Sequence, residues 1–204
     1  MTGDATNVFI NCPFDVDYRP LFDAAVFAIF RSGFTARSAL EVDDGGKNRF
    51  DKICGIVSQC DLGMHDISRV ETDGDPPLPR FNMPFELGVF IGAQRLGGKA
   101  HRKKRCIIFD TEPYRYQRFI SDISGHDIHA HGGSQGTIIL ELATWLRAQG
   151  PVAEVPGGVG IAEEYEEFRL ALPEILLDRG LAAAEMQFGD YCAIIAQYLK
   201  ATAT

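Results

Sequence analysis

Residues 7–33 have the sequence NVFINCPFDVDYRPLFDAAVFAIFRSG. The first six form a short apolar run that stops at Pro13, which is typical of a buried β-strand. Residues 18–32 then repeat apolar side chains at helical spacing, and Gly33 follows as a helix-ending residue. A buried strand joined to an amphipathic helix is the repeating unit of a parallel α/β sheet, so the segment predicts that class of fold.

The same alternation continues as far as residue 150. Only residues 68–81 interrupt it, because they are too polar and too rich in proline and glycine for an element of their own. Strands are predicted at residues 7–12, 34–40, 62–67, 105–110 and 127–130, and helices at 18–32, 49–60, 82–96, 114–121 and 137–149. The pattern predicts an α/β, doubly wound, flavodoxin-like sheet of five parallel strands with helices on both faces, plus a C-terminal helical pair.

The chain is expected to divide at a linker. Residues 1–150 form the predicted α/β domain, and residues 151–160 have the glycine and proline content of a connection. The remaining segment, residues 161–204, contains helical patterns at 161–179 and 188–200. A segment of this length cannot bury a core of its own, so we expect the two helices to pack on the α/β domain or on a partner.

Composition and charge exclude several classes of function. The chain has 204 residues, a formal net charge of −8 and a pI near 5.1, so we expect no broad nucleic-acid binding. It shows neither a secretion signal nor an apolar stretch that could cross a bilayer, which predicts a cytoplasmic protein without membrane association. The basic run at residues 99–105 is expected to be a solvated loop.

Cysteine usage and known motifs narrow the chemistry further. The five cysteines are odd in number and widely spaced, which predicts reduced thiols. No zinc-binding spacing is present, so we expect no metal and no bound cofactor. The first strand is not followed by a dinucleotide-binding glycine motif, and the motif of serine hydrolases is absent.

Ligands of doubly wound sheets bind beyond the carboxyl ends of the strands. Three polar segments reach that edge: one after the first strand, one after the third, and one at the start of the next helix. Their candidate substrate-binding residues are Asn11, Cys12, Pro13, Phe14, Tyr18, His65, Ser68, Arg69, Arg80, Asn82 and Met83. The rings of Phe14 and Tyr18 can stack on a base or join the core. Asn82 is also a good N-cap for the helix predicted at residues 82–96.

Glu86 is the first candidate catalytic residue. Between residues 82 and 93 it is the only charged side chain, and its neighbours predict a helix buried on most faces. In the first turn the helix dipole would keep the carboxylate ionised, and a carboxylate that opens into a pocket suits attack on an anomeric carbon. The alternative is a first-turn glutamate that only complements the dipole.

Asp66 is the second candidate catalytic residue. It follows the third strand and is expected to lie close to Glu86, where two carboxylates with separated pKa values divide the work of acid and nucleophile. The alternatives are a turn aspartate at Asp66 and a packing histidine at His65. Four arginines are expected near the same edge of the sheet, and each can hold a phosphate or form a surface ion pair: Arg37, Arg49, Arg69 and Arg80.

Two motifs resemble a known superfamily. VFINCPF (residues 8–14) resembles the first strand and turn of nucleoside 2-deoxyribosyltransferases and deoxynucleotide N-glycosidases, and MPFELGVFIGA (83–93) resembles the helix that carries their nucleophilic glutamate. Glu86 stands at that glutamate and Asp66 at the family's aspartate after the third strand. Toll/interleukin receptor (TIR) domains belong to the same superfamily. The family's Asp-x-Gly-Thr is replaced here by residues 80–83, which argues against deoxyribose specificity and base exchange.

The resemblance implies an enzyme that cleaves or transfers a base–sugar bond of NAD or of a nucleotide or nucleoside. The chain is also similar to bacterial proteins of unassigned activity that share LPRFNMPFELG (residues 78–88), and TIR relatives imply a role in antiphage defence. Two alternatives remain open: a non-catalytic nucleotide-binding sensor and a TIR-like assembly module. The partner is expected to be a small nucleotide or nucleoside, and the chain is expected to form a homo-oligomer.

Overall fold

The computed structural model describes residues 6–41, 44–70, 72–73, 78–150 and 155–202. Its centre is a five-stranded sheet in the order β2-β1-β3-β6-β7, in which every pair of neighbours runs parallel. The strands are β1 (Asn7–Asn11), β2 (Thr35–Ser38), β3 (Leu62–Asp66), β6 (Arg105–Asp110) and β7 (Ile128–Ala130). The predicted doubly wound sheet is confirmed, and the strand order reverses between β1 and β3.

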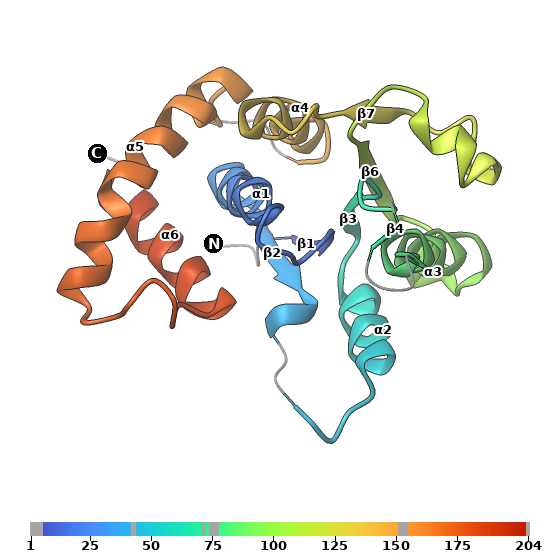
Figure 1. Cartoon of the computed structure of the whole chain (residues 1–204), viewed down its shortest axis with the longest axis horizontal. Coiled ribbons are helices and arrows are strands. Elements are labelled where there is room, and N and C mark those ends of the chain that lie inside the picture. Colours follow the sequence, from blue (N-terminus) through green and yellow to red (C-terminus); the bar gives the residue numbers. More distant parts are fainter. Residues whose placement is uncertain (1–5, 42–43, 71, 74–77, 151–154, 203–204) are drawn as a thin grey trace.

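Helices cover both faces of this sheet (Figure 1). One face carries α1 (Arg19–Arg31) and α4 (Gln135–Arg147), and the other carries α2 (Arg49–Gln59) and α3 (Asn82–Leu96). The outer helix α5 (Gly158–Asp178) packs on α4 and α1, and α6 (Phe188–Thr202) packs on α1. Short 3-10 turns complete the chain: η1 (Ala39–Glu41), η2 (Lys99–His101), η3 (Arg115–Arg118) and η4 (Ser121–Ile123).

The two C-terminal helices share the core of the sheet. Phe27 of α1 stacks on Phe168 of α5 with 5.2 Å between ring centroids, and Phe22 meets Phe188 of α6 at 5.8 Å. The hydroxyl of Tyr191 donates to the main-chain oxygen of Asp23 at 3.2 Å. Each fully buried phenylalanine contributes about 1.5–3 kcal/mol, so α5 and α6 stabilise α1 substantially.

Several predicted boundaries are wrong in detail. Residues 68–81 contain a short antiparallel hairpin, β4 (Thr72–Asp73) with β5 (Leu78–Pro79), because strands of two residues are too short to show an alternating pattern. The helix predicted at residues 114–121 is replaced by η3 and η4. Residues 158–160 of the predicted linker are the first turn of α5, and residues 151–154 lie outside the described residues.

The prediction of a solvated loop at residues 99–105 is wrong for Lys104. Its side chain is buried, and its ammonium group donates to the main-chain oxygens of Val57, at 2.5 Å, and of Cys60. It also lies 5.1 Å from the centre of the Phe90 ring, and burial lowers the pKa of the amine. Lys104 therefore caps the C-terminal carbonyls of α2, which a charge count along the sequence does not indicate.

Candidate active site at the carboxyl edge of the sheet

The carboxyl ends of β1 and β3 meet where the strand order reverses. Asn11 ends β1 opposite His65, and Asp66 ends β3 opposite Phe109 of β6. Side chains alternate across a strand, so Asn11 and His65 face α2 and α3, whereas Asp66 faces α1 and α4. Because the other candidate carboxylate, Glu86, comes from α3, the two approach this edge from opposite faces of the sheet.

On the α3 face, polar contacts tie the end of β1 to the start of α3. The Asn11 amide donates to the main-chain oxygen of Met83 at 2.8 Å and lies 3.1 Å from Nδ1 of His65. The His65 ring is fully buried between Phe9 and Phe90, and burial lowers its pKa to about 3, so the ring is neutral at pH 7. Asn11 and His65 thus hold α3 in place, as the packing interpretation of His65 requires.

Glu86 is the fifth residue of α3, and only 5% of it is exposed. Burial raises the pKa of its carboxyl group above the ordinary value, and the positive charge of Arg49 lowers that pKa in part. Within the described part of the chain, no hydrogen bond or ion pair reaches the carboxylate. An unpaired buried carboxylate costs roughly several kcal/mol, so this position destabilises the fold unless a ligand uses it.

The helix around Glu86 differs from the prediction. α3 begins at Asn82 with Phe81 as its N-cap and no side-chain cap, so Asn82 is not the N-cap and Glu86 lies beyond the first turn, where the dipole is weak. Only one face of α3 is buried, because Phe85 is 58% exposed. On the outer face, Phe85 meets Phe50 of α2.

Asp66 is fully buried and accepts hydrogen bonds with both oxygens. Oδ2 accepts from the Tyr18 hydroxyl at 2.6 Å, and Oδ1 accepts from the main-chain N–H of Ser68 at 2.8 Å. Nε2 of His131 also lies 3.2 Å from Oδ2, although without the angle of a hydrogen bond. Because Nδ1 of His131 accepts from Gly133 N–H at 2.9 Å, the proton of the neutral ring is on Nε2, toward Asp66.

The buried thiol of Cys12 is subject to the charges of both carboxylates. Burial raises the pKa of its thiol well above the ordinary value, and the negative charges of Asp66 and Glu86 raise it further. Both charges therefore act on one sulfur atom at the end of β1. The thiol stays neutral and serves packing, so Cys12 is not a nucleophile in this fold.

Arg69 and Arg80 bind carboxylates of the loop between β1 and α1. The Nη2 atom of Arg69 lies 3.1 Å from Asp15 and 3.1 Å from Asp17, and Nη1 of Arg80 lies 3.7 Å from Asp15. Exposed pairs of this kind contribute about 0–1 kcal/mol each. They join the loop after β1 to the segments that follow β3, so the predicted polar segments do converge.

Two cavities at this edge are lined by predicted residues. The larger, of about 530 Å³, lies on the α1 and α4 side, and its lining includes Tyr18, Ser68, Arg69, Thr111, His131 and Gln135. The second, of about 390 Å³, includes Pro13, Phe14 and the start of α6. Glu86 lines neither of these two cavities, so neither is the pocket expected at this carboxylate.

The two rings proposed to stack on a base differ in exposure. Phe14 is 37% exposed and packs edge-to-face on Phe22 at 5.7 Å. Tyr18 is buried, and its hydroxyl group is held by Asp66. Tyr18 also lines the larger cavity, and the stacking role of both rings stays a prediction.

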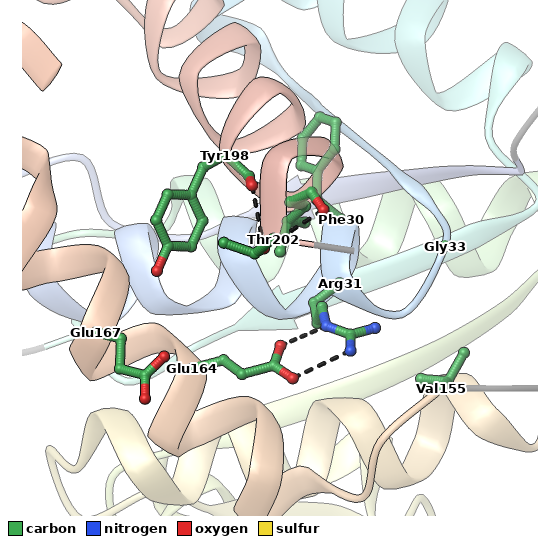
Figure 2. Close-up of a pocket in the computed structure, with 9 residues that line it drawn as sticks. Phe30, Arg31, Gly33, Val155, Glu164, Glu167, Tyr198 and Thr202 are labelled. Carbon is green, nitrogen blue, oxygen red and sulfur yellow. Dashed lines mark hydrogen bonds and ion pairs between the residues drawn. The ribbon is translucent and has the colours of Figure 1, made fainter. Parts of the chain in front are cut away.

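A third cavity, of about 520 Å³, lies at the opposite edge of the sheet (Figure 2). Its lining includes Gly33, which leads into β2, and this places the cavity at the amino ends of the strands. Figure 2 shows Arg31 and Glu164 joined across it, and Nη2 of Arg31 lies 3.0 Å from Oε1 of Glu164. No predicted site residue lines this cavity.

Sequence reasoning missed the polar residues that follow β6 and β7. His131 comes directly after β7, and Thr111 directly after β6. Asp110 ends β6 and binds Arg115, whose guanidinium also donates to the main-chain oxygen of Ser68 at 2.6 Å. The rule that identified Asn11 and Asp66, polar residues at strand ends, would have found these residues if it had been applied to all five strands.

The described residues and the comparisons add four findings. No helix of the described chain is long and apolar enough to cross a membrane, and no group of three histidine, cysteine, aspartate or glutamate side chains within it is arranged to hold a metal ion. All five cysteines are free. Comparison with protein-family models, with curated proteins and with solved structures found no match.

Proposed function

We propose that this chain is an N-glycosidase or ribosyltransferase that cleaves the base–sugar bond of NAD or of a nucleotide, with Glu86 as its catalytic carboxylate. The observation that carries the proposal is the unpaired, buried carboxylate of Glu86 beside the point where strand order reverses. Such a group destabilises the fold and is retained most readily where it reacts. The resemblance of residues 83–93 to the nucleophile helix of deoxyribosyltransferases supports the same role.

The proposed step forms one bond and breaks another. An oxygen of Glu86 attacks the anomeric carbon, or stabilises its positive charge, while the carbon–nitrogen bond breaks and its electron pair leaves with the base. For NAD the departing nicotinamide is neutral and takes no proton. The base of an ordinary nucleotide takes one proton from water as it leaves. Water or another hydroxyl acceptor then attacks the anomeric carbon, the bond to Glu86 breaks to restore its carboxylate, and the acceptor's proton passes to solvent.

Asp66 receives a positioning role in this proposal instead of the predicted acid role. Both of its oxygens already accept hydrogen bonds, from Tyr18 and Ser68. A carboxylate engaged in this way holds the loop after β3 and the start of α1 together at the crevice. A pyridinium leaving group suits this arrangement, because its departure requires no general acid.

Base release tests the proposal. The purified protein is incubated with NAD and, separately, with the nucleoside monophosphates, and free base is measured by chromatography over a range of protein concentrations. We expect wild type to release base and Glu86→Gln to be slower by roughly 10³-fold or more, within the range for loss of an essential catalytic group. Glu163→Gln, an exposed change on α5, is the matched control and is expected to keep full activity. Equal, background-level release by wild type and Glu86→Gln would contradict the proposal.

A second candidate function is a nucleotide-binding sensor without catalysis. It is favoured by the cavity of about 530 Å³, which has several neutral polar side chains and does not include Glu86. For a sensor, nucleotides should raise the melting temperature and be recovered intact by mass spectrometry. The predicted role in antiphage defence and the predicted homo-oligomer remain predictions, and light scattering at several concentrations tests the latter.

A further inference from the structure

Two exposed aromatic rings meet beside Glu86, where α2 and α3 begin. Phe50 of α2 is 40% exposed and Phe85 of α3 is 58% exposed, yet their ring centroids are 5.3 Å apart. Each ring therefore keeps surface in solvent while the pair forms one apolar platform. Phenylalanine pairs at this distance are normal in cores, whereas at the surface a joined pair offers a ring-shaped ligand a place to stack.

The sequence neighbours of these rings are two residues of opposite charge. Arg49 precedes Phe50, and Glu86 follows Phe85. Arg49 is exposed and lies one turn before the buried Ile53, at the start of α2. The first turn of α2 also contains Asp51, but that residue is about 200° around the helix from Arg49 and projects elsewhere.

Arg49 differs from the other arginines at this edge, of which Arg115 binds Asp110. Arg37 bonds Glu41 at 2.9 Å, and Arg69 and Arg80 bind the acidic loop after β1. In the described chain Arg49 has no hydrogen bond or ion pair, and its charge is the one that acts on Glu86. Arginines already neutralised by carboxylates bind phosphate poorly, so Arg49 is the guanidinium available for an anion.

We propose that Arg49, Phe50 and Phe85 form the substrate-binding subsite of the proposed enzyme, in which Arg49 binds a phosphate of the nucleotide and the two rings stack on its base. The inference rests on the proposed function, because it assigns the part of the substrate that leads to Glu86. Stacking on an aromatic ring tolerates any base, and a guanidinium fork recognises any phosphate. The subsite thus defines a class of ligand, a nucleotide with an accessible phosphate.

Binding, measured without turnover, tests the subsite. In the Glu86→Gln background, calorimetry gives the Kd for NAD, for the nucleoside monophosphates and for the matching nucleosides without phosphate. We expect Arg49→Gln to weaken nucleotide binding by roughly 10–100-fold, the loss of a charge-assisted bidentate contact, and to leave nucleoside binding unchanged. Phe85→Ser should weaken binding of both by roughly 5–100-fold, the range for loss of one stacked base.

Two exposed changes elsewhere serve as controls. Arg102→Gln, on the loop before β6, and Leu177→Ser, on the outer side of α5, should leave every Kd unchanged. Equal effects of Arg49→Gln on nucleotides and nucleosides, or no nucleotide binding at all, would overturn the subsite. A change of oligomeric state in Phe85→Ser with unchanged Kd would identify the platform as a contact between copies, which also overturns it.

The subsite and the proposed function fail in different ways. If wild type releases base but Arg49→Gln keeps its affinity for phosphate, only the subsite is wrong. If nucleotides bind through Arg49 but wild type never releases base, the proposed binding site is correct and the proposed enzymatic activity is wrong.

Discussion

The two carboxylates that the sequence predicts as catalytic have opposite surroundings. Asp66, on the α1 and α4 face, accepts from Tyr18 and Ser68 and lies 3.2 Å from His131. Glu86, on the α3 face, is nearly as buried but has no donor within the described chain. Both carboxylates are therefore buried, but only that of Asp66 accepts hydrogen bonds from the described part of the protein.

This difference assigns different roles to similar side chains. A carboxylate surrounded by donors stabilises the structure that supplies them, and its removal leaves those donors unpaired. A carboxylate without donors weakens the fold and is available to a ligand. Stability measurements therefore give opposite signs for the two positions, independently of any activity assay.

Asp66→Ala should give the largest change. We expect the free energy of unfolding to fall by about 3 kcal/mol, because the Tyr18 hydroxyl and the Ser68 N–H lose their acceptor inside the protein. For a chain of this length the melting temperature should fall by roughly 6–12 °C. Asp127→Ala, at an exposed position, is the control with little expected change. A loss below about 1 kcal/mol would show that the hydrogen bonds accepted by Asp66 do not stabilise the fold.

Tyr18→Phe should have an intermediate effect. The substitution removes only the hydroxyl that donates to Asp66 at 2.6 Å. Hydrogen bonds to charged groups contribute about 1.5–3 kcal/mol, and we expect a loss near the lower end, measured by urea unfolding. In an Asp66→Ala background the same substitution should lower the free energy of unfolding much less. Strict additivity of the two effects would contradict the proposed interaction between Tyr18 and Asp66.

Glu86→Gln should change stability in the opposite direction. Because burial raises the folded-state pKa of Glu86, the folded protein binds more protons than the unfolded chain between the two pKa values, so wild type loses stability as pH rises through the raised pKa. Glutamine cannot ionise, so we expect it to be more stable by about 1 kcal/mol at pH 8, or roughly 2–4 °C in melting temperature. The gain should shrink toward pH 4.5, near the ordinary carboxyl pKa. A destabilised variant at pH 8 would show that Glu86 has a partner.

The smallest effect is expected from the pair Arg49 and Glu86. A double-mutant cycle with Arg49→Gln and Glu86→Gln should give a coupling of about 0.5 kcal/mol at low salt and almost none at 1 M salt, because the exposed Arg49 forms no ion pair with Glu86 and its charge is screened. Coupling that persists at 1 M salt would mean that Arg49 forms a buried ion pair and is not available to phosphate.

Strand and helix positions could be predicted where the pattern is local. The continuous apolar run of β6 and the helical spacing of α3 give the observed bounds, Arg105–Asp110 and Asn82–Leu96. The sheet class follows from repetition of such units. The identity of the N-cap, which is Phe81 and not Asn82, and the two-residue strands of the hairpin β4–β5 depend on contacts that have no sequence period.

The site could be predicted only in part, for the same reason. The rule for strand ends placed Asn11, His65 and Asp66 at one edge, where the structure has them. It could not give the face from which each side chain comes, nor that Tyr18 and His131, far from Asp66 in sequence, meet it. Whether a carboxylate has donors depends on such long-range contacts.

The packing of α1 has a consequence for synthesis of the chain. The apolar side chains of residues 19–31 are covered by α5 and α6, which are encoded more than a hundred residues later. A ribosome adds about 5–20 residues each second, so the emerging α1 waits roughly 10–30 s for α6. During that interval its phenylalanines are open to chaperones and to other nascent chains, and slower translation of the C-terminal helices should increase aggregation.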